Sequence, residues 1–396
     1  MSIEPEEYLA KLVSYRTISI DLKENSKLLD YVEKQFTEAG LYVKRYTHNG
    51  YSSILASTRK NNLKAPRLCL AAHVDVVAGP KNLFTLQFER HKLRGRGAFD
   101  MKFATASYLS LLDRIKDNLK DYDLGFMITS DEEVGGHDGV RWLLDQGYKP
   151  GFTLLPDHGN FGFWNIEESA KGVMELKVSA RGKAGHSSRV WEGENAITKL
   201  GKFLYHLNEL HFREQGPETS TFSINQIKGG LGPTLTQIPD KAEAYLDFRF
   251  ISKEDRKRLL TEIERMALIC DIKIDEPLID GPVHAVDMDL AMVQELANCI
   301  EDVSGDAIQY VNAYGASDAR FFDPKGLLCL VFGLPGGGHH GDDEWVDRNA
   351  VRQLDDVLYR YIEKVARFDK PALTKKVKST TINRFTPETV ASSGKS

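Results

Sequence analysis

The stretch LGFMITSDEEVGG, residues 124–136, places three consecutive acids, Asp131, Glu132 and Glu133, directly after an apolar run. The run 124–130 predicts a buried strand, because strands covered on both faces read as continuous apolar sequence. Three neighbouring carboxylates at the end of such a strand repel one another. The stretch therefore predicts a buried sheet and a positive partner for the acids at its edge.

The segments around this stretch alternate in the same way. Apolar runs at 67–77 and 152–156 predict two more buried strands, and the segments 102–115 and 140–148 predict helices. Strands that alternate with helices build a mixed or parallel sheet with helices on both faces. We therefore expect an α/β fold in which polar residues beyond the carboxyl ends of the strands form the site.

The pattern changes after about residue 170. Segments 173–182 and 242–250 alternate apolar and polar residues, which is typical of strands with one solvated face. The other elements expected here are helices at 195–210 and 253–269 and strands at 221–227 and 271–277. Buried α/β sequence then returns, with a strand at 326–333 and a last helix marked by apolar residues from Leu354 to Val365. The sequence predicts a larger domain in two parts, 1–170 and 285–370, a smaller α+β domain inserted at 171–284, and a flexible tail at 371–396.

Composition narrows the class of protein. A chain of 396 residues favours two domains, and 41% hydrophobic with 28% charged residues is typical of soluble globular proteins. The net charge of −5 favours neither a nucleic-acid nor a membrane partner. No apolar run approaches a membrane span, and the first residues lack the regions of a secretory signal. Four widely spaced cysteines indicate reduced thiols, and we expect a cytoplasmic protein.

Carboxylates and imidazoles gather at the ends of the predicted strands. They are His73, Asp75, Asp100, Glu132, Glu133, Asp157 and His340. Singly, each has an ordinary interpretation, such as a helix cap at Asp100 or a turn at Asp157. Together, concentrated negative charge beside neutral imidazoles calls for a cation, and nitrogen and oxygen ligands without thiolates fit zinc, cobalt or manganese. The positive partner of the acids is therefore predicted to be a metal.

Seven short sequence motifs follow one another along the chain, and their order is informative. They are HVD, GRGAFDMK, TSDEEVGG, GKAGHSS, ENAI, DFRF and GASDARFF. Their order resembles that of the co-catalytic di-zinc metallopeptidase family of acetylornithine deacetylase, succinyl-diaminopimelate desuccinylase, aminoacylase, glutamate carboxypeptidase and several dipeptidases. The resemblance runs from about residue 5 to 368. It implies a zinc-exopeptidase-like catalytic domain, a mixed central sheet flanked by helices, with an inserted lid and dimerisation domain that pairs two chains.

The resemblance also implies a role for each residue at the strand ends. His73 and Asp157 would hold the first of two divalent ions, Asp100 would bridge both ions, and Glu133 would hold the second. His340 would be the last ligand, because it stands four residues before Glu344 as in the family, whereas His339 does not. Asp75 would orient the His73 ring. The Asp100–Met101 peptide is expected to be cis, as in relatives.

Glu132 is the carboxylate left without a metal. In the family, the corresponding residue takes a proton from a water shared by the two ions and delivers it to the leaving nitrogen. The resemblance therefore predicts hydrolysis of an amide, with Glu132 acting first as base and then as acid.

Residues outside the metal set carry implied roles as well. His186 in GKAGHSS matches a histidine that reaches the partner subunit's site and stabilises the oxyanion. Arg249 in DFRF matches an arginine that pairs with a substrate carboxylate. Asn225 and the loop with Ser317, Asp318 and Arg320 match a substrate-facing polar set.

Three departures bear on the substrate. The chain lacks a proline soon after GHSS, has the bulky Tyr314 in YGASD, and carries Asp157 where deacetylases and desuccinylases usually have Glu. The last departure favours a dipeptide or a small aminoacyl amide. We expect hydrolysis of an amide next to a free carboxylate, in a dipeptide or an N-acyl amino acid. The alternatives are an N-carbamoyl or ureido amidohydrolase and a catalytically silent binding protein on the same fold.

Overall fold

The computed structural model describes residues 4–157, 161–211, 215–230, 235–275 and 277–369. The chain divides into two compact units. The larger unit takes residues up to 169, residues 285–313 and residues from 317 onward, and the smaller unit takes 170–284 and 314–316. The tail predicted at 371–396 lies outside the described residues.

The larger unit is built on a nine-stranded sheet with the order β1-β2-β6-β3-β7-β18-β8-β16, and β17 pairs with β8. The strands β6, β3, β7 and β18 run parallel, whereas β1, β2 and β8 join antiparallel. The bounds are β1 (Tyr42–His48), β2 (Tyr51–Ser57), β3 (Leu68–His73), β6 (Leu124–Thr129), β7 (Phe152–Leu155), β8 (Asn165–Ala170), β16 (His284–Ala285), β17 (Gln309–Ala313) and β18 (Cys329–Gly333). The predicted mixed sheet is confirmed.

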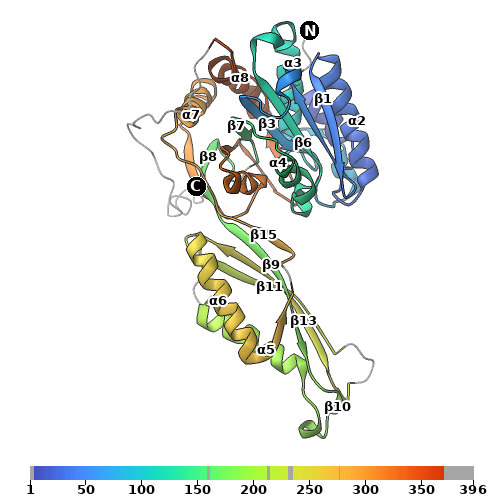
Figure 1. Cartoon of the computed structure of the whole chain (residues 1–396). Helices are drawn as coiled ribbons and strands as arrows, with labels where there is room; N and C mark the ends of the chain where they lie inside the picture. Colours follow the sequence, from blue (N-terminus) through green and yellow to red (C-terminus); the bar gives the residue numbers. More distant parts are fainter. Residues whose placement is uncertain (1–3, 158–160, 212–214, 231–234, 276, 370–396) are drawn as a thin grey trace, which may run out of the picture. The chain divides into compact units, whose positions relative to one another are not determined.

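Helices cover this sheet, as Figure 1 shows for the larger unit. They are α1 (Pro5–Val13), α2 (Leu22–Glu38), α3 (Lys102–Ile115), α4 (Trp142–Asp145), α7 (Ala291–Ser304) and α8 (Arg348–Val365). Helices α1, α3 and α8 pack on one another, and α2 packs on β1 and β2. The strands β3, β6, β7 and β18 are buried along their whole length, which explains their continuous apolar sequence. Two helices begin at aspartate caps, α2 at Asp21 and α8 at Asp347.

A small sheet in the larger unit joins distant parts of the chain. Its order is β19-β20-β5-β4, with β4 (Gln87–Phe88), β5 (Lys92–Arg94), β19 (Gly336–Gly337) and β20 (Trp345–Asp347). Trp345 pairs with Arg94 and Val346 pairs with Leu93. This pairing brings the glycine-rich loop before β20 next to the residues that follow β5.

The smaller unit is an antiparallel sheet with two helices on one face (Figure 1). Its main order is β11-β13-β9-β14, with β15 also on β9. The bounds are β9 (Gly172–Arg181), β11 (Thr221–Gly229), β13 (Lys241–Phe250), β14 (Ile272–Ile274), β15 (Ile279–Gly281), α5 (Ala196–His211) and α6 (Lys253–Cys270), and a separate pair is formed by β10 (Gly185–His186) and β12 (Gln237–Ile238). Strand β13 alternates buried and half-buried residues, and the buried ones pack with the helices in a core of their own. The alternation read from the sequence therefore corresponds to one covered and one open face.

Short helical turns complete the chain. The 3-10 turns are Lys60–Asn62, Lys81–Phe84, Lys116–Asp121, Glu132–Val134 (η4), Val190–Glu192, Asp318–Phe321 (η7) and Asp323–Lys325, and His137–Arg141 forms a π-helical turn before α4. Among the described residues, no helix combines the length and the apolar character needed to span a bilayer.

Candidate metal centre

The predicted ligands of the larger unit meet at the carboxyl ends of its parallel strands. His73 is the last residue of β3, the acids 131–133 follow β6, and Asp157 follows β7 by two residues. Strand β3 pairs in parallel with both β6 and β7, so these three ends lie at one edge of the sheet. The topology therefore gathers residues that are up to 84 positions apart in the sequence.

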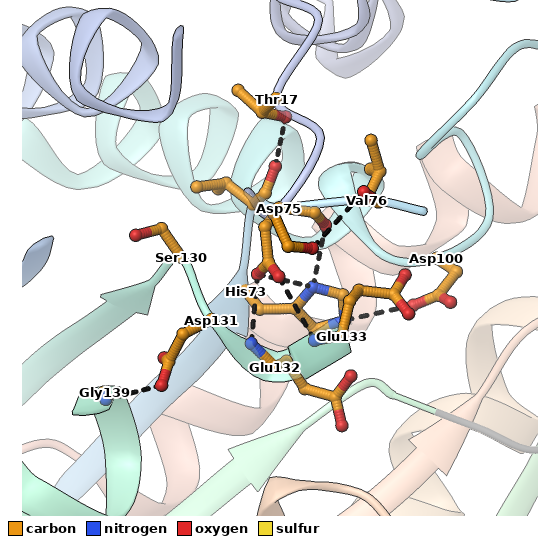
Figure 2. A network of polar contacts seen from close by, with 12 residues as sticks. Thr17, His73, Asp75, Val76, Asp100, Ser130, Asp131, Glu132, Glu133 and Gly139 are labelled. Carbon is orange, nitrogen blue, oxygen red and sulfur yellow. Dashed lines mark hydrogen bonds and ion pairs between the residues drawn. The ribbon is translucent and has the colours of Figure 1, made fainter. Parts of the chain in front are cut away.

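The His73 ring is buried between two aspartates, as Figure 2 shows. Its Nδ1 lies 3.1 Å from the backbone oxygen of Asp75 and 3.5 Å from Asp75 Oδ1. Its Nε2 lies 3.0 Å from Asp100 Oδ1. When Nδ1 donates its proton to Asp75, Nε2 keeps the lone pair that a metal ligand needs.

The Asp75 carboxylate supports the turn that carries the acids. Its Oδ1 accepts the backbone N–H of Glu132 at 3.2 Å, and its Oδ2 accepts that of Glu133 at 3.1 Å (Figure 2). The sequence predicted that Asp75 orients His73. In the structure, the Asp75 backbone oxygen is closer to that ring than the carboxylate, and the carboxylate also anchors η4.

Asp100 lies at the centre of the cluster. The carboxylate Oδ1 faces His73, while Oδ2 lies 2.7 Å from His339 Nε2 and 3.1 Å from His340 Nε2. The peptide from Asp100 to Met101 is cis, as the resemblance implied. One carboxylate with imidazoles on both oxygens has the arrangement of a ligand that bridges two ions.

Two groups of ligand atoms share Asp100. The first is His73, Asp100 and Asp157, and the second is Asp100, His339 and His340, with the ligand atoms of each group within 4.8 Å of one another. His340 Nε2 also lies 3.1 Å from Glu133 Oε2. The spacing argument favoured His340 over His339. The structure brings both rings to Asp100, and the His340 ring also reaches Glu133.

The electrostatics of the cluster fit a divalent cation. Burial, and then the neighbouring Asp100, raise the pKa of Glu133 to about 7. Burial, and then Glu132, raise the pKa of Asp157 to about 8. Such raised pKa values mean that the neighbouring cationic groups do not offset the effects of burial and of the nearby carboxylates. A bound divalent ion would favour the ionised form of these carboxyl groups. Imidazole nitrogens and carboxylate oxygens without a thiolate suit zinc, cobalt or manganese.

The three consecutive acids, Asp131, Glu132 and Glu133, each have different neighbours. Asp131 turns away from the ligands, and its Oδ2 accepts the backbone N–H groups of Asp138 and Gly139, both at 2.8 Å (Figure 2). Glu133 faces His340. Partial burial raises the pKa of the Glu132 carboxyl group, and the nearby His73 and Arg320 oppose this rise. The Nη1 atom of Arg320 lies 3.9 Å from Glu132 Oε1.

Arg320 is a residue whose position the sequence did not reveal. It is 3% exposed, donates from Nη2 to the Gly135 oxygen at 2.8 Å, and donates from Nη1 to the Ser317 oxygen at 2.8 Å. Asp318 is buried beside it, and a Cβ at Gly136 would lie only 2.0 Å from Asp318 Oδ1. The loop before η7 therefore packs tightly on the turn that carries Glu132. The motif GASDARFF was the available signal, but it gave no partner for the arginine.

The remaining predicted site residues lie in two places. Ser317 and Asp318 belong to the larger unit, and Ser317 Oγ accepts the Ala319 N–H at the start of η7. His186, Asn225 and Arg249 belong to the smaller unit.

Each of these three residues of the smaller unit has a local partner. His186 Nδ1 lies 2.8 Å from Ser188 Oγ, and Asn225 Oδ1 accepts from Ser223 Oγ at 2.7 Å. The Arg249 Nε and Nη2 atoms each donate to Asp247, both at 2.8 Å. Arg249 therefore holds the Asp247 carboxylate with two hydrogen bonds.

Comparison with known proteins identifies relatives of this chain. Residues 69–364 match the sequence profile of peptidase family M20/M25/M40. The chain is 26% identical over 388 residues to the succinyl-diaminopimelate desuccinylase of Rickettsia akari, an alignment that covers 90% of this chain and 99% of the relative.

Solved structures show the same fold. A tripeptidase from Staphylococcus aureus superposes with a TM-score of 0.75 at 18% identity and covers 91% of this chain and 97% of its own. A family M20 metallo-carboxypeptidase from Sulfolobus solfataricus also has a TM-score of 0.75, at 16% identity, over 91% of this chain and 99% of its own. The profile match spans well over half of the chain and includes the predicted ligands at the strand ends. The chain therefore belongs to peptidase family M20/M25/M40 and is a metal-dependent hydrolase.

Proposed function

We propose that this protein hydrolyses an amide bond next to a free carboxylate, in a dipeptide or an N-acyl amino acid. Two divalent ions would be held by His73, Asp100, Glu133, Asp157 and His340, and zinc is the metal that we propose first. The observation that carries the proposal is the Asp100 carboxylate, which faces His73 with one oxygen and His340 with the other. We assign the catalytic domain to the larger unit and the lid to the smaller one.

The chemistry divides between the ions and one carboxylate. When bound, the ions supply an acidified water and a polarised carbonyl. Glu132 accepts the proton of the attacking water and returns it to the leaving nitrogen. Burial raises the pKa of Glu132, which helps its carboxyl group to hold a proton near neutral pH. Its neighbour Arg320 acts in the opposite direction and keeps the ionised form accessible.

Recognition of the substrate carboxylate is assigned to Arg249. The guanidinium uses Nε and Nη2 to hold Asp247, and a guanidinium has five N–H donors. The other donors remain available for the carboxylate of the substrate. Asn225, Ser317 and Asp318 are proposed to complete the polar contacts with the substrate, with His186 as a donor to the oxyanion of the partner subunit's site.

We also propose that two smaller units pair in a homodimer. Among the described strands, β11 pairs with β13 alone, so its other edge is open. Exposed apolar side chains lie along β11 and the helix α5, namely Ile224, Ile227, Ile197 and Tyr205. An open edge with an apolar surface is a site for pairing.

The expected cytoplasmic location stays a prediction, and the four cysteines are free thiols in the structure.

The proposed substrate class within the family rests on one residue, Asp157, and one experiment can test it. Asp157 favours a dipeptide, whereas the relative from Rickettsia akari is named for a succinylated substrate. Protein reconstituted with zinc should be assayed against dipeptides and N-acetyl, N-succinyl and N-carbamoyl amino acids. Release of an amino acid from a dipeptide or an N-acyl substrate supports the proposal. Ammonia release from N-carbamoyl substrates alone would point to a ureido hydrolase, and hydrolysis of none of them would point to a binding protein.

A further inference from the structure

Two of the proposed ligands come from distant parts of the chain and need a common support. Asp100 follows the small-sheet strand β5, and His340 lies in the loop before β20. Between these two segments lies a buried ion pair, Arg96 with Glu344, which are 2% and 1% exposed. Its two charges are joined by an Nη1 to Oε2 hydrogen bond of 2.7 Å.

Glu344 holds the backbone at Asp100. Its Oε1 accepts the N–H of Phe99 at 2.9 Å and the N–H of Asp100 at 3.1 Å. Its own backbone oxygen accepts the N–H of Gly95 at 3.1 Å. A shift of Glu344 would therefore move the residue whose carboxylate is shared by both ligand groups.

Arg96 holds the backbone at His340. Its Nη2 donates to the His340 oxygen at 3.2 Å and to the Ala78 oxygen at 3.4 Å. His340 has φ 60°, a left-handed conformation that residues other than glycine rarely adopt. Such a conformation persists where the surroundings fix it, and the Arg96 contact is one of the contacts that do so.

The pair thus connects the two ligand segments through both of its members. The ladder between β20 and β5 brings the segments together, and Arg96 and Glu344 fix their final separation. A buried ion pair adds little net stability compared with apolar residues of the same size, so stability alone is a weak reason for its presence. Partners of this kind tune the affinity of a site for metal.

We propose that Arg96 and Glu344 are positioning residues that set the separation of Asp100 and His340 and thereby the affinity of the site for divalent ions. This inference rests on the proposed metal ligands. Neither residue is among the proposed metal ligands, and each acts through the backbone of such a ligand.

Two variants test the pair. Glu344→Gln keeps the size of the side chain and one oxygen but removes the charge that holds Arg96. Arg96→Lys keeps the positive charge but lacks the fork needed to reach Glu344 and His340 together. If Glu344→Gln fails to fold, Arg96→Lys answers the same question.

A matched control comes from another buried carboxylate. Glu6 of α1 is 3% exposed and pairs with Arg348 and Arg352 of α8. Among the described residues, its hydrogen bonds and ion pairs include no proposed metal ligand. Glu6→Gln therefore removes a similar buried charge, and it should lower the melting temperature without changing the affinity for metal.

The measurement is the Zn²⁺ dissociation constant, from competition with a chromophoric chelator, together with the melting temperature of the metal-free protein. We expect affinity for zinc to fall by roughly 10- to 100-fold in Glu344→Gln and Arg96→Lys, and to stay within about two-fold of wild type in Glu6→Gln. Wild-type affinity in the folded Arg96 and Glu344 variants, or an equal loss in Glu6→Gln, would overturn the inference. Wild-type protein that binds no zinc would instead overturn the proposed function on which it rests.

Discussion

Asp75 fixes the backbone of Glu132: the Asp75 Oδ1 accepts the Glu132 N–H at 3.2 Å, and the other oxygen accepts the next N–H, that of Glu133. Asp75 follows β3, and Glu132 follows the neighbouring strand β6. The contact joins the ends of two parallel strands and starts the turn from which Glu133 meets His340 and Glu132 lies near Arg320. One carboxylate thereby separates the proposed metal ligand, Glu133, from the proposed proton carrier, Glu132.

Replacing Asp75 should disturb both functions of the turn. Asp75→Ala leaves two backbone N–H groups without their acceptor, so we expect kcat/KM to fall by roughly 10- to 100-fold, with weaker zinc binding. Asp75→Asn keeps one acceptor oxygen and should lose less. Steady-state kinetics and zinc affinity check this order. Equal losses in the two variants would show that charge, rather than the N–H contacts, is what matters at Asp75.

Metal binding should release protons. Hydrogen bonds to Asp100 and Glu133 raise the pKa of His340 to about 10, and burial raises the pKa of Asp157 to about 8. Without an ion, both groups are largely protonated at pH 7, and each must lose its proton to bind a metal. Affinity for zinc should therefore fall as the pH is lowered from about 9 to 6. Titration calorimetry in buffers of different ionisation enthalpy measures the protons released, and a heat that is independent of the buffer would contradict this prediction.

The buried sheet was predictable because its strands leave a local signal. The apolar runs at 124–130 and 152–156 and the helix at 102–115 appear as β6, β7 and α3 with similar bounds. The segment 67–77 was predicted too long, since β3 ends at His73. The edge strands β1 and β2 and the helices α1 and α2 were not predicted.

The residues proposed as ligands could be singled out in the sequence, since each ends or follows a predicted strand or lies in a glycine-rich loop. The contacts between them could not, because they depend on tertiary pairing. The pairing of β20 with β5 brings Glu344 to Asp100, and the packing of η7 brings Arg320 to Glu132. Neither leaves a pattern in nearby sequence. Asp247 lies two residues before Arg249, but its bidentate contact depends on side-chain conformations that the sequence does not reveal.

Substrates should carry a free carboxylate that Arg249 recognises. Replacing that carboxylate by an amide should cost about 2 kcal/mol or more in kcat/KM, because the guanidinium loses a charged partner. The measurement compares one dipeptide with its C-terminal amide, in wild type and in Arg249→Ala. If wild type prefers the amide, or if the variant penalises both substrates equally, Arg249 does not read the carboxylate.

Asp247 provides a further test of that arginine. Asp247→Asn keeps an acceptor for the Arg249 guanidinium but removes the negative charge that would repel a substrate carboxylate bound to the other donors of that guanidinium. We expect KM for the dipeptide to fall, with little change for its amide. An equal change for both substrates would show that the charge of Asp247 does not act on the substrate carboxylate.

His186 should act in the site of the partner subunit. His186→Ala removes a donor to the oxyanion, so kcat should fall by roughly 10²-fold while zinc content stays unchanged. Mixing this variant with Glu132→Gln should recover activity, since a hybrid dimer contains one site with both residues intact. If confirmed subunit exchange restores no activity, then His186 acts within its own chain or has no part in the reaction.

Glu132 is proposed to carry the proton while its neighbours hold the ions, and this division of roles can be measured in a single variant. The measurement is kcat of zinc-loaded Glu132→Gln, with zinc content determined on the same sample and Glu6→Gln as a control for the loss of a buried carboxylate. The amide keeps the size of the side chain but cannot accept the proton. We predict two zinc ions per chain, as in wild type, and a kcat lower by roughly 10²-fold or more. Wild-type kcat with full zinc content would contradict the account, because the proton would then have another carrier.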